Sequence, residues 1–474
     1  MPKTNYQDLE KKLIAPRKNA WEVWDEKTKQ SSFKFSEGYK KFLNQAKTER
    51  EAVTASLELA RQAGFKDMAA AKSLKVGDKV YTVNRGKNLF LAKIGKKPLS
   101  HGFNMIMPHI DSPHLDLKVM PLYEDEGLAF LKTHYYGGIK KYQWPTIALA
   151  LHGRVYLENG ATVEINIGEK DSDPIFMITD LLPHIDRHGF PGLKVESREI
   201  QGEDLNLMVG SIPVKDEKIK EKVKLAILEY LWNEYGLKEI DLASAELRAV
   251  PCEKARDLGF DRSLIAAFGQ DDLVCAYAAL LGIIESKASE KTQILAMVDR
   301  EEIGSAGNTG ANSYFLETFV SDLSKLVGGE DDLDYVYKIF SKSQAISADV
   351  TAGLDPDYKD AFDIRNTCRL GFGLAIEKYT GHGGKYSASE ASGEFMQKLM
   401  ALYNKNKAII YQLVGGMGKI DKGGGGTIAK YLANRNMEVI DAGVALFNMH
   451  APLEIASKAD IFCAYLGYKA FLEN

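Results

Sequence analysis

Two adjacent carboxylates, Glu301 and Glu302, follow an apolar run at residues 294–298, with two residues in between. Acidic side chains at the end of a buried strand repel each other and lose hydration. Their ionised forms therefore need a cation nearby, and a bound metal ion is the usual solution. We interpret one carboxylate as a metal ligand and its neighbour as a base. A solvated turn after a strand is the alternative if the pair is taken by itself.

Further candidate ligands follow other short apolar segments or open a helix. They are His109 after residues 103–107, Asp349 after residues 345–347, His450 after residues 444–447, and Asp271 before the helical pattern that starts at residue 272. Ligands in open α/β sheets bind beyond the carboxyl ends of the strands, so we expect these side chains to meet Glu302. Two imidazoles and three carboxylates suit one or two divalent ions of the zinc, cobalt or manganese type.

Asp111 lies two residues after His109 and could accept the proton of the ring nitrogen that does not bind metal. Such a contact fixes the tautomer of a metal-binding histidine. A hydrogen-bonded structural histidine is the alternative for an isolated His-x-Asp pair. The other histidines, such as His101, His114 and His152, have no comparable sequence context.

Charge counting indicates what such a site could do. Two divalent ions would bring four positive charges and Asp271, Glu302 and Asp349 three negative ones, which leaves about one charge for a bridging hydroxide to balance. Metal binding lowers the pKa of water to about 7, so this hydroxide is the expected nucleophile. Glu301 could then take the proton of the attacking water and deliver it to a leaving nitrogen. The expected chemistry is metal-assisted hydrolysis of an amide.

The composition is that of a globular protein without a basic surface. The chain has 474 residues, of which 45% are hydrophobic and 27% charged, and its net charge is -4. This balance argues against nucleic acid as a partner. We find no apolar run long enough to cross a bilayer and no apolar core of a signal peptide, so we expect no membrane partner and a cytoplasmic protein. Four widely spaced cysteines give no sign of a thiolate zinc site or a disulfide framework.

The order of elements along the chain predicts two domains. A helical pattern at residues 37–63 and a hairpin at residues 79–94 precede alternating, strand-like sequence at residues 133–178. After a helical segment at residues 216–235, strands and helices alternate up to a last helix expected from residue 452. We therefore predict an α/β fold with a mixed, largely parallel sheet flanked by helices, and an inserted β-rich domain.

Five segments together resemble the M18 family of metalloaminopeptidases, whose best-known members are aspartyl aminopeptidases. They are HIDSPHLDLK at residues 109–118, QDDL at 270–273, DREEIGS at 299–305, SADVTA at 347–352 and NMHAP at 448–452. The resemblance implies a zinc-peptidase-like catalytic domain at residues 1–112 and 248–474, and a dimerisation domain at residues 113–247. It also implies peptide substrates and a homo-oligomer, which could be a dodecamer built from dimers.

The resemblance implies a role for each candidate residue. Asp271 would bridge two divalent ions, most simply zinc, with cobalt or manganese as alternatives. His109 and Asp349 would complete one metal site, and Glu302 and His450 the other. Glu301 would be the general base and Asp111 the residue that orients His109. His184 would reach the active site of a neighbouring subunit, with a capping role in a loop as the alternative.

The sequence departs from the family pattern at two places. The usual Leu-Asp-Asn-Leu is Gln-Asp-Asp-Leu at residues 270–273, which makes Asp272 an alternative to Asp271 as the bridging residue. Aspartyl members carry basic residues before a tyrosine, whereas this chain has Gly-His-Gly-Gly-Lys-Tyr at residues 381–386. Lys385 could pair with an acidic N-terminal residue of the substrate or be solvated, so a neutral N-terminal residue is also credible.

Two other functions fit the same ligands. A related two-metal hydrolase could cleave N-acyl or C-terminal amide bonds, and a non-catalytic assembly module could keep the metals for stability. The spare carboxylate of Glu301 favours an enzyme, because a purely structural ion does not need it.

Overall fold

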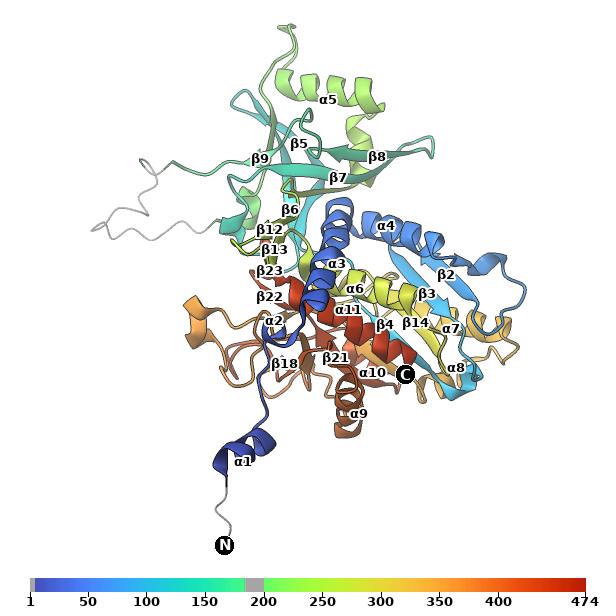
Figure 1. The fold of residues 1–474 in the computed structure, drawn as a ribbon. Helices are drawn as coiled ribbons and strands as arrows, with labels where there is room; N and C mark the ends of the chain where they lie inside the picture. The colour runs from blue at the N-terminus through green and yellow to red at the C-terminus, as the bar shows by residue number, and fades with distance from the viewer. Residues whose placement is uncertain (1–4, 183, 185–199) are drawn as a thin grey trace.

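A nine-stranded sheet forms the centre of the molecule in the computed structural model, which describes residues 5–182, 184 and 200–474 (Figure 1). The strand order is β1 (Lys66–Asp67), β2 (Lys79–Asn84), β3 (Asn88–Lys93), β14 (Thr292–Met297), β4 (Phe103–Met107), β15 (Gln344–Ser347), β21 (Glu438–Gly443), β17 (Leu374–Glu377) and β19 (Tyr411–Val414). Its central strands β14, β4, β15 and β21 are parallel, while β3 and β17 pair antiparallel with this block. The predicted mixed, largely parallel sheet is therefore confirmed.

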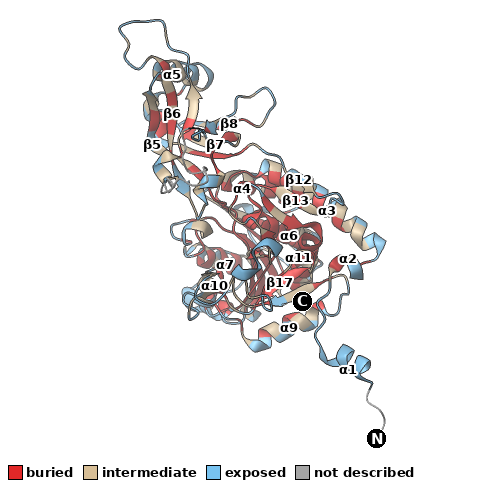
Figure 2. Cartoon of the chain, turned by 90° about the vertical axis from the view of Figure 1, so that its left-hand side faces the viewer, coloured by how far each residue is buried: buried red, intermediate tan, exposed pale blue. Residues whose placement is uncertain are grey.

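Helices cover both faces of this sheet because successive residues of each strand point to opposite faces. Ile106 and Leu295 belong to one buried apolar cluster, which includes side chains of α3 (Glu26–Gln45), α4 (Glu49–Gln62), α6 (Gln270–Glu285), α9 (Gly393–Tyr403) and α11 (Lys458–Glu473). Met105 and Ile294 belong to a second cluster, which includes side chains of α7 (Phe315–Leu326), α8 (Leu333–Phe340) and α10 (Ala429–Ala433). Figure 2 shows that α6 and α11 are buried along most of their length. The metal-ligand candidates therefore sit on a rigid layer.

Three details differ from the sequence-based expectation. The helical pattern at residues 37–63 is split into α3 and α4, since Thr48 caps a new helix by accepting a hydrogen bond from the backbone N–H of Glu51. The last helix begins at Lys458, and the residues before it form β23 (Glu454–Ser457). The strand expected at residues 444–447 is β22 (Ala445–Phe447), which lies outside the main sheet.

Strand β22 belongs to a smaller, five-stranded sheet beside the main one. Its order is β12 (Arg256–Leu258), β13 (Leu264–Ala267), β23, β22 and β16 (Thr351–Ala352). The strand that precedes β22 along the chain is β21 of the main sheet, which the sequence analysis did not predict. A two-stranded ribbon joins β18 (Gly381–His382) to β20 (Gly424–Gly425), so two of the four consecutive glycines at residues 423–426 are paired in a ribbon.

The inserted β-rich unit is a seven-stranded antiparallel sheet, as expected, and lies above the main sheet in Figure 1. Its order is β8 (Thr162–Ile167), β7 (Leu149–Tyr156), β11 (Glu246–Pro251), β5 (His114–Asp125), β6 (Leu128–Tyr136), β10 (Leu207–Gly210) and β9 (Met177–Ile178). Helix α5 (Lys222–Tyr235) packs against it. Strand β6 runs back toward the main sheet and ends beside the ligand candidates.

Buried polar side chains join α4 to the inserted sheet. Glu49 accepts a hydrogen bond from Arg248 of β11, and Arg50 donates to Glu246 at 2.8 Å. His152 of β7 lies between two carboxylates, with Nδ1 2.8 Å from Glu51 and Nε2 3.1 Å from Glu169. Charged hydrogen bonds therefore hold α4 against the inserted sheet.

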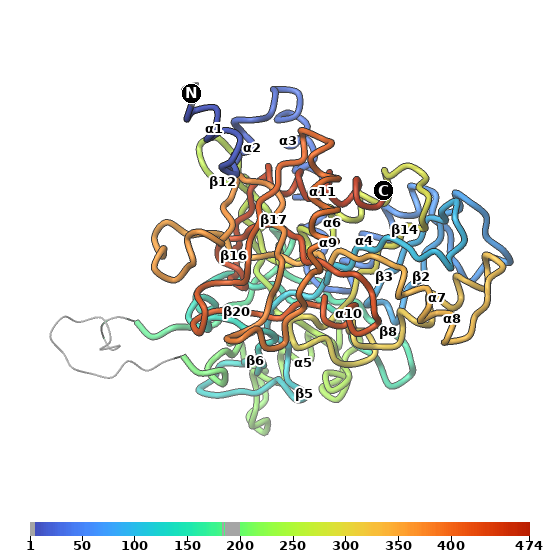
Figure 3. Tube along the Cα trace, turned by 90° about the horizontal axis from the view of Figure 1, so that it is seen from below, coloured from blue at the N-terminus to red at the C-terminus, as the bar shows by residue number. Residues whose placement is uncertain are grey.

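The N-terminal segment runs along the side of the body formed by α3 and α11 (Figure 3). Trp24, at the end of α2 (Ala20–Val23), packs edge-on against Phe462 of α11. Helix α1 (Tyr6–Leu13) has no buried residue. Within the described ranges, no helix combines the length and apolarity that a membrane span requires. All four cysteines are free thiols.

Candidate metal centre

The main sheet brings three of the candidates together at the carboxyl ends of neighbouring strands. His109 follows β4 and forms a bridge with Val298, just beyond β14. Glu302 lies in the turn after β14, and Asp349 follows β15, the other neighbour of β4. His450 reaches the same place from the loop between β22 and β23, and Asp271 from the start of α6.

Asp271 lies between the two histidines. Its Oδ1 is 3.2 Å from Nε2 of His109, and its Oδ2 is 3.2 Å from Nε2 of His450. On the first side, Oδ1 of Asp349 is 3.7 Å from Nε2 of His109. On the second side, Oε2 of Glu302 is 3.4 Å from Nε2 of His450. One histidine and one further carboxylate thus flank each oxygen of Asp271.

Asp272 occupies a different position from Asp271. Its Oδ2 accepts a hydrogen bond from the backbone N–H of His109 at 3.3 Å, so this oxygen is already engaged by the backbone. Two groups have ligand atoms close enough to hold an ion: His109 with Asp271 and Glu302, and His109 with Asp272 and Asp349. Only Asp271 presents an oxygen to each of the two histidines, which is the geometry that a bridging carboxylate needs.

The electrostatics of the cluster favour bound cations. Burial, and then the nearby charge of Asp271, hold the pKa of Glu302 well above its usual range, and burial likewise raises the pKa of Asp349. Burial also opposes ionisation of Asp271, but its contacts with His109 and His450 lower its pKa. Within the described residues, Oδ1 of Asp271, Oδ1 of Asp272 and Oε1 of Glu302 are buried without a hydrogen-bond partner. Divalent ions would satisfy such oxygens, so the residues fit a metal centre.

Glu301 opens the same short turn as Glu302. Burial, and then the charge of Asp349, raise its pKa to about 8. Both backbone N–H groups of this turn donate to Asp111: Glu301 to Oδ1 at 3.1 Å and Glu302 to Oδ2 at 3.2 Å. The carboxylate of Asp111 therefore caps the turn and fixes where Glu301 and Glu302 point.

His109 and Asp111 are in contact as expected, but the nearest atom of Asp111 is its backbone oxygen and not its carboxylate. Nδ1 of His109 is 2.9 Å from the backbone oxygen of Asp111 and 3.3 Å from its Oδ1. The carbonyl is therefore the nearer acceptor for the ring proton. The side chain of Asp111 instead serves mainly the Glu301–Glu302 turn, a role that the sequence did not indicate.

Three residues at the site were missed by sequence reasoning. Glu454 accepts hydrogen bonds from the backbone N–H groups of His450 at 2.9 Å and Asp271 at 3.1 Å, so it joins two ligand candidates. The backbone oxygen of Gly138 lies 2.7 Å from Nδ1 of His450, and the hydroxyl of Tyr136 donates to Asp111 at 2.8 Å. In the sequence, only Glu454 could have been noticed, as an acidic residue in the apolar segment after His450. Tyr136 and Gly138 belong to the inserted unit, and nothing in the sequence connects them with the site.

The two substrate-binding candidates lie in other environments. Lys385 is half exposed, lies 2.9 Å from Glu390 and sits 4.2 Å from the ring centre of Tyr379. His184 is exposed, and its neighbours in sequence, Pro183 and residues 185–199, fall outside the described residues. The structure brings neither side chain into hydrogen-bonding contact with the five ligand candidates, within the part of the chain that it describes.

Two further buried carboxylates lie on the two strands that follow β15 in the order of the main sheet, and β15 is the strand that leads to Asp349. Glu377 of β17 and Asp441 of β21 are register partners, and Asp441 is also the register partner of Ser347, two residues before Asp349. Hydrogen bonds come to them from Thr351 and Thr427. Burial raises the pKa of Glu377 to about 8 and that of Asp441 to about 7. This side of the site is therefore acidic, a feature absent from the sequence prediction.

Comparison with known proteins gives consistent matches over nearly the whole chain. Residues 42–472 match the family model described as aminopeptidase I zinc metalloprotease (M18). The probable M18 family aminopeptidase 1 of Clostridium acetobutylicum is 46% identical over 466 residues, or 98% of this chain and 99% of that protein. The crystal structure of an M18 family aminopeptidase from Thermotoga maritima has a TM-score of 0.92 at 41% identity, covering 97% of this chain and 100% of that one.

A more distant structure, the mApe1 dodecamer of Saccharomyces cerevisiae, has the same fold. Its TM-score is 0.73 at 20% identity, and the match covers 94% of this chain and 97% of that one.

Proposed function

Since this chain belongs to the M18 family of zinc metalloproteases and is an aminopeptidase, we propose that it hydrolyses the N-terminal peptide bond at a centre of two divalent ions. The proposed ligands are His109, Asp271, Glu302, Asp349 and His450. Zinc is the first candidate metal, as the family description indicates, with cobalt or manganese as alternatives.

One observation carries this proposal. The two oxygens of Asp271 face different histidines at 3.2 Å each, and each histidine has a second carboxylate nearby, Asp349 on one side and Glu302 on the other. This arrangement divides the cluster into two half-sites that share one carboxylate. When bound, divalent ions supply Lewis acidity to the scissile carbonyl and lower the pKa of a water to about 7.

Glu301 is the proposed general base. It lies in the same turn as Glu302, and burial raises the pKa of its carboxyl group, which favours a group that accepts a proton. It would take the proton of the attacking water and deliver it to the leaving nitrogen of the peptide. Asp111 holds the turn that carries Glu301 in place by accepting hydrogen bonds from the backbone N–H groups of Glu301 and Glu302.

The residue released from the substrate is proposed to be neutral rather than acidic. The ammonium group of Lys385 already lies 2.9 Å from Glu390, so an acidic substrate side chain would have to displace an internal partner. This internal ion pair argues against the aspartyl preference of the best-known family members.

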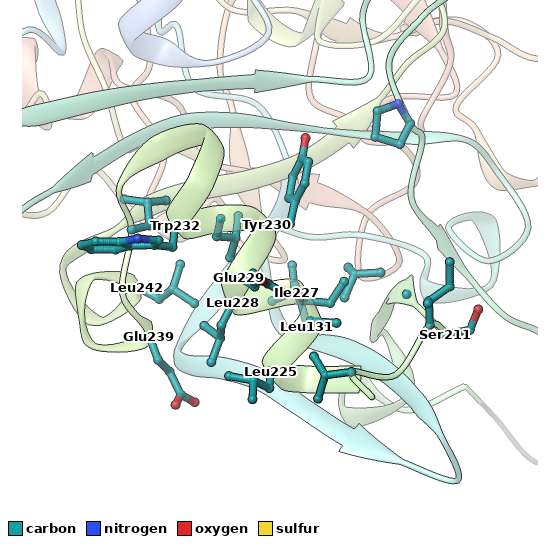
Figure 4. A pocket seen from close by; sticks show the side chains of 18 of the residues that line it. Leu131, Ser211, Leu225, Ile227, Leu228, Glu229, Tyr230, Trp232, Glu239 and Leu242 are labelled. Carbon is teal, nitrogen blue, oxygen red and sulfur yellow. The ribbon is translucent and has the colours of Figure 1, made fainter. Parts of the chain in front are cut away.

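We also propose that the chain forms a homo-oligomer in which residues 113–247 make dimer contacts. The solved relative described as a dodecamer supports an assembly. A cavity of about 1480 Å³ lies between α5 and the inserted sheet, and Leu225, Ile227 and Leu228 of α5 are among the residues that line it (Figure 4). Trp232 on the same helix is 54% exposed. Apolar surface of this kind is typical of a contact between subunits, and light scattering of the purified protein measures the size of the assembly.

A panel of aminoacyl fluorogenic substrates, with and without an N-acetyl group, tests the function. The enzyme should be assayed after chelation and after re-addition of zinc, cobalt or manganese. We expect release from free amines, with leucyl or alanyl substrates cleaved faster than aspartyl ones. Faster cleavage of N-acetylated substrates would instead indicate an N-acyl hydrolase. No release with any ion would indicate a non-catalytic module.

A further inference from the structure

The inserted sheet reaches the metal centre at the end of strand β6. The hydroxyl group of Tyr136, the last residue of β6, donates a hydrogen bond to Oδ2 of Asp111 at 2.8 Å. Two residues later, the backbone oxygen of Gly138 lies 2.7 Å from Nδ1 of His450. Gly137 packs so closely that a Cβ atom there would lie 3.3 Å from Oε2 of Glu302. One short segment of the insertion thus contacts three parts of the site.

Both oxygens of the Asp111 carboxylate accept hydrogen bonds. Oδ1 accepts the N–H of Glu301 at 3.1 Å, and Oδ2 accepts the N–H of Glu302 at 3.2 Å. The phenol of Tyr136 provides the shortest of these contacts and the only one from a side chain outside the ligand loops. Charge-assisted hydrogen bonds to carboxylates are stronger than neutral ones, so this contact contributes strongly to the orientation of the group.

The ring of Tyr136 is itself held in place. It stacks on the ring of His114, its register partner on β5, with centroids 4.5 Å apart and planes 15° apart. Nδ1 of His114 lies 2.7 Å from the backbone oxygen of Ser112, whose hydroxyl donates to the backbone oxygen of Asp271 at 2.7 Å. Burial raises the pKa of Tyr136 well above its usual value of 10, so the phenol remains a donor.

We propose that Tyr136 is a positioning residue through which the inserted sheet fixes Asp111, and through Asp111 both His109 and the Glu301–Glu302 turn. This inference rests on the proposed roles of Glu301 as base and His109 as ligand. Within the described residues the phenol makes no hydrogen bond to the five ligand candidates, and its proposed action is to hold the carboxylate of Asp111 against the turn. Residues that orient metal ligands typically change metal affinity or activity by about 10- to 100-fold when they are removed.

Tyr136→Phe is the test, because it removes one oxygen and keeps the ring that stacks on His114. Tyr135→Phe is the matched control: Tyr135 is the preceding residue of β6, on the other face, and its hydroxyl has no hydrogen bond within the described residues. Both proteins should be compared with wild type for kcat and KM on a leucyl substrate. Zinc affinity should be measured without substrate by competition with a chelator, and Tm by thermal denaturation.

The expected result for Tyr136→Phe is a fall in kcat of about 10-fold, KM within about twofold of wild type, and zinc affinity weakened by about 10-fold or more. Tyr135→Phe should match wild type in all three. Values of kcat and zinc affinity for Tyr136→Phe that equal those of Tyr135→Phe, whatever its Tm, would overturn the inference. If wild type cleaves no substrate, the proposed function fails, and the zinc competition alone still decides the role of Tyr136.

Discussion

Neutralising His152 should remove a pH-dependent part of the stability of this protein. His152 is 1% exposed, and each ring nitrogen faces a carboxylate, Nδ1 that of Glu51 and Nε2 that of Glu169. Both nitrogens can donate only when the ring is protonated. Burial alone would lower the pKa of His152, but the hydrogen bonds with Glu169 and Glu51 raise it from 6.5 to about 9.

The direction and size of the effect follow from this pKa. A histidine whose pKa is higher in the folded than in the unfolded state stabilises the fold fully below pH 6.5, and this contribution is lost as the pH rises through about 9. At 1.36 kcal/mol per pKa unit, the difference corresponds to about 3 kcal/mol. His152→Gln should therefore cost about 3 kcal/mol more at pH 6 than at pH 9.5, since Gln carries no charge at either pH.

Urea denaturation of wild type and His152→Gln at pH 6, 7, 8 and 9.5 measures this difference. The gap in the free energy of unfolding should be largest at pH 6 and shrink steadily above pH 6.5. His101→Gln is the control, since His101 is exposed and makes no ion pair within the described residues. A gap for His152→Gln that is constant from pH 6 to 9.5 would refute the reasoning, as would a titration of His152 near its unfolded value.

Four substitutions test the metal centre directly. Glu301→Gln should lower turnover by about 100-fold or more while zinc content stays unchanged, because general base catalysis supplies about 10²- to 10⁴-fold; turnover equal to wild type would remove Glu301 from the mechanism. Asp271→Asn should reduce bound metal at both positions, whereas Asp272→Asn should retain at least one ion; the reverse result in metal analysis would make Asp272 the bridging residue. Gly443→Ala should weaken zinc binding in a chelator competition, since a Cβ atom there would lie 1.7 Å from the backbone oxygen of Asp349; an unchanged affinity would contradict this displacement.

The fold class was predictable because the sequence shows two patterns, an alternation of residues typical of strands and an alternation of strand and helix segments. Alternation at residues 133–178 indicated an antiparallel unit, and alternating strands and helices after residue 270 indicated a parallel layer; both are confirmed. The predictions failed where short strands adjoin each other. Only the apolar residues 444–447 were predicted as a strand, which is β22, and the preceding strand β21 of the main sheet was missed. Strand β23 was taken for the start of the last helix because four residues are too few to show a period.

The positions of the ligand candidates were predictable for a similar reason. Carboxyl ends of parallel strands meet at one edge of a sheet, and His109, Glu302 and Asp349 each follow such a strand. Contacts across the two sheets were not predictable. His152 had no distinguishing context in the sequence, yet it lies between carboxylates that are 101 and 17 residues away along the chain.

The sequence by itself determined the family, the fold class and the set of residues that could hold metal, because these depend on residue types and short spacings. Only the tertiary structure decided which atoms face one another. In the folded chain, one oxygen of Asp271 faces each histidine. The carboxylate of Asp111 accepts hydrogen bonds from the Glu301–Glu302 turn and from Tyr136 of the inserted sheet. Hydrogen bonds and ion pairs act over about 3 Å, and distances of that order between residues far apart in sequence are set by packing, which no local pattern records.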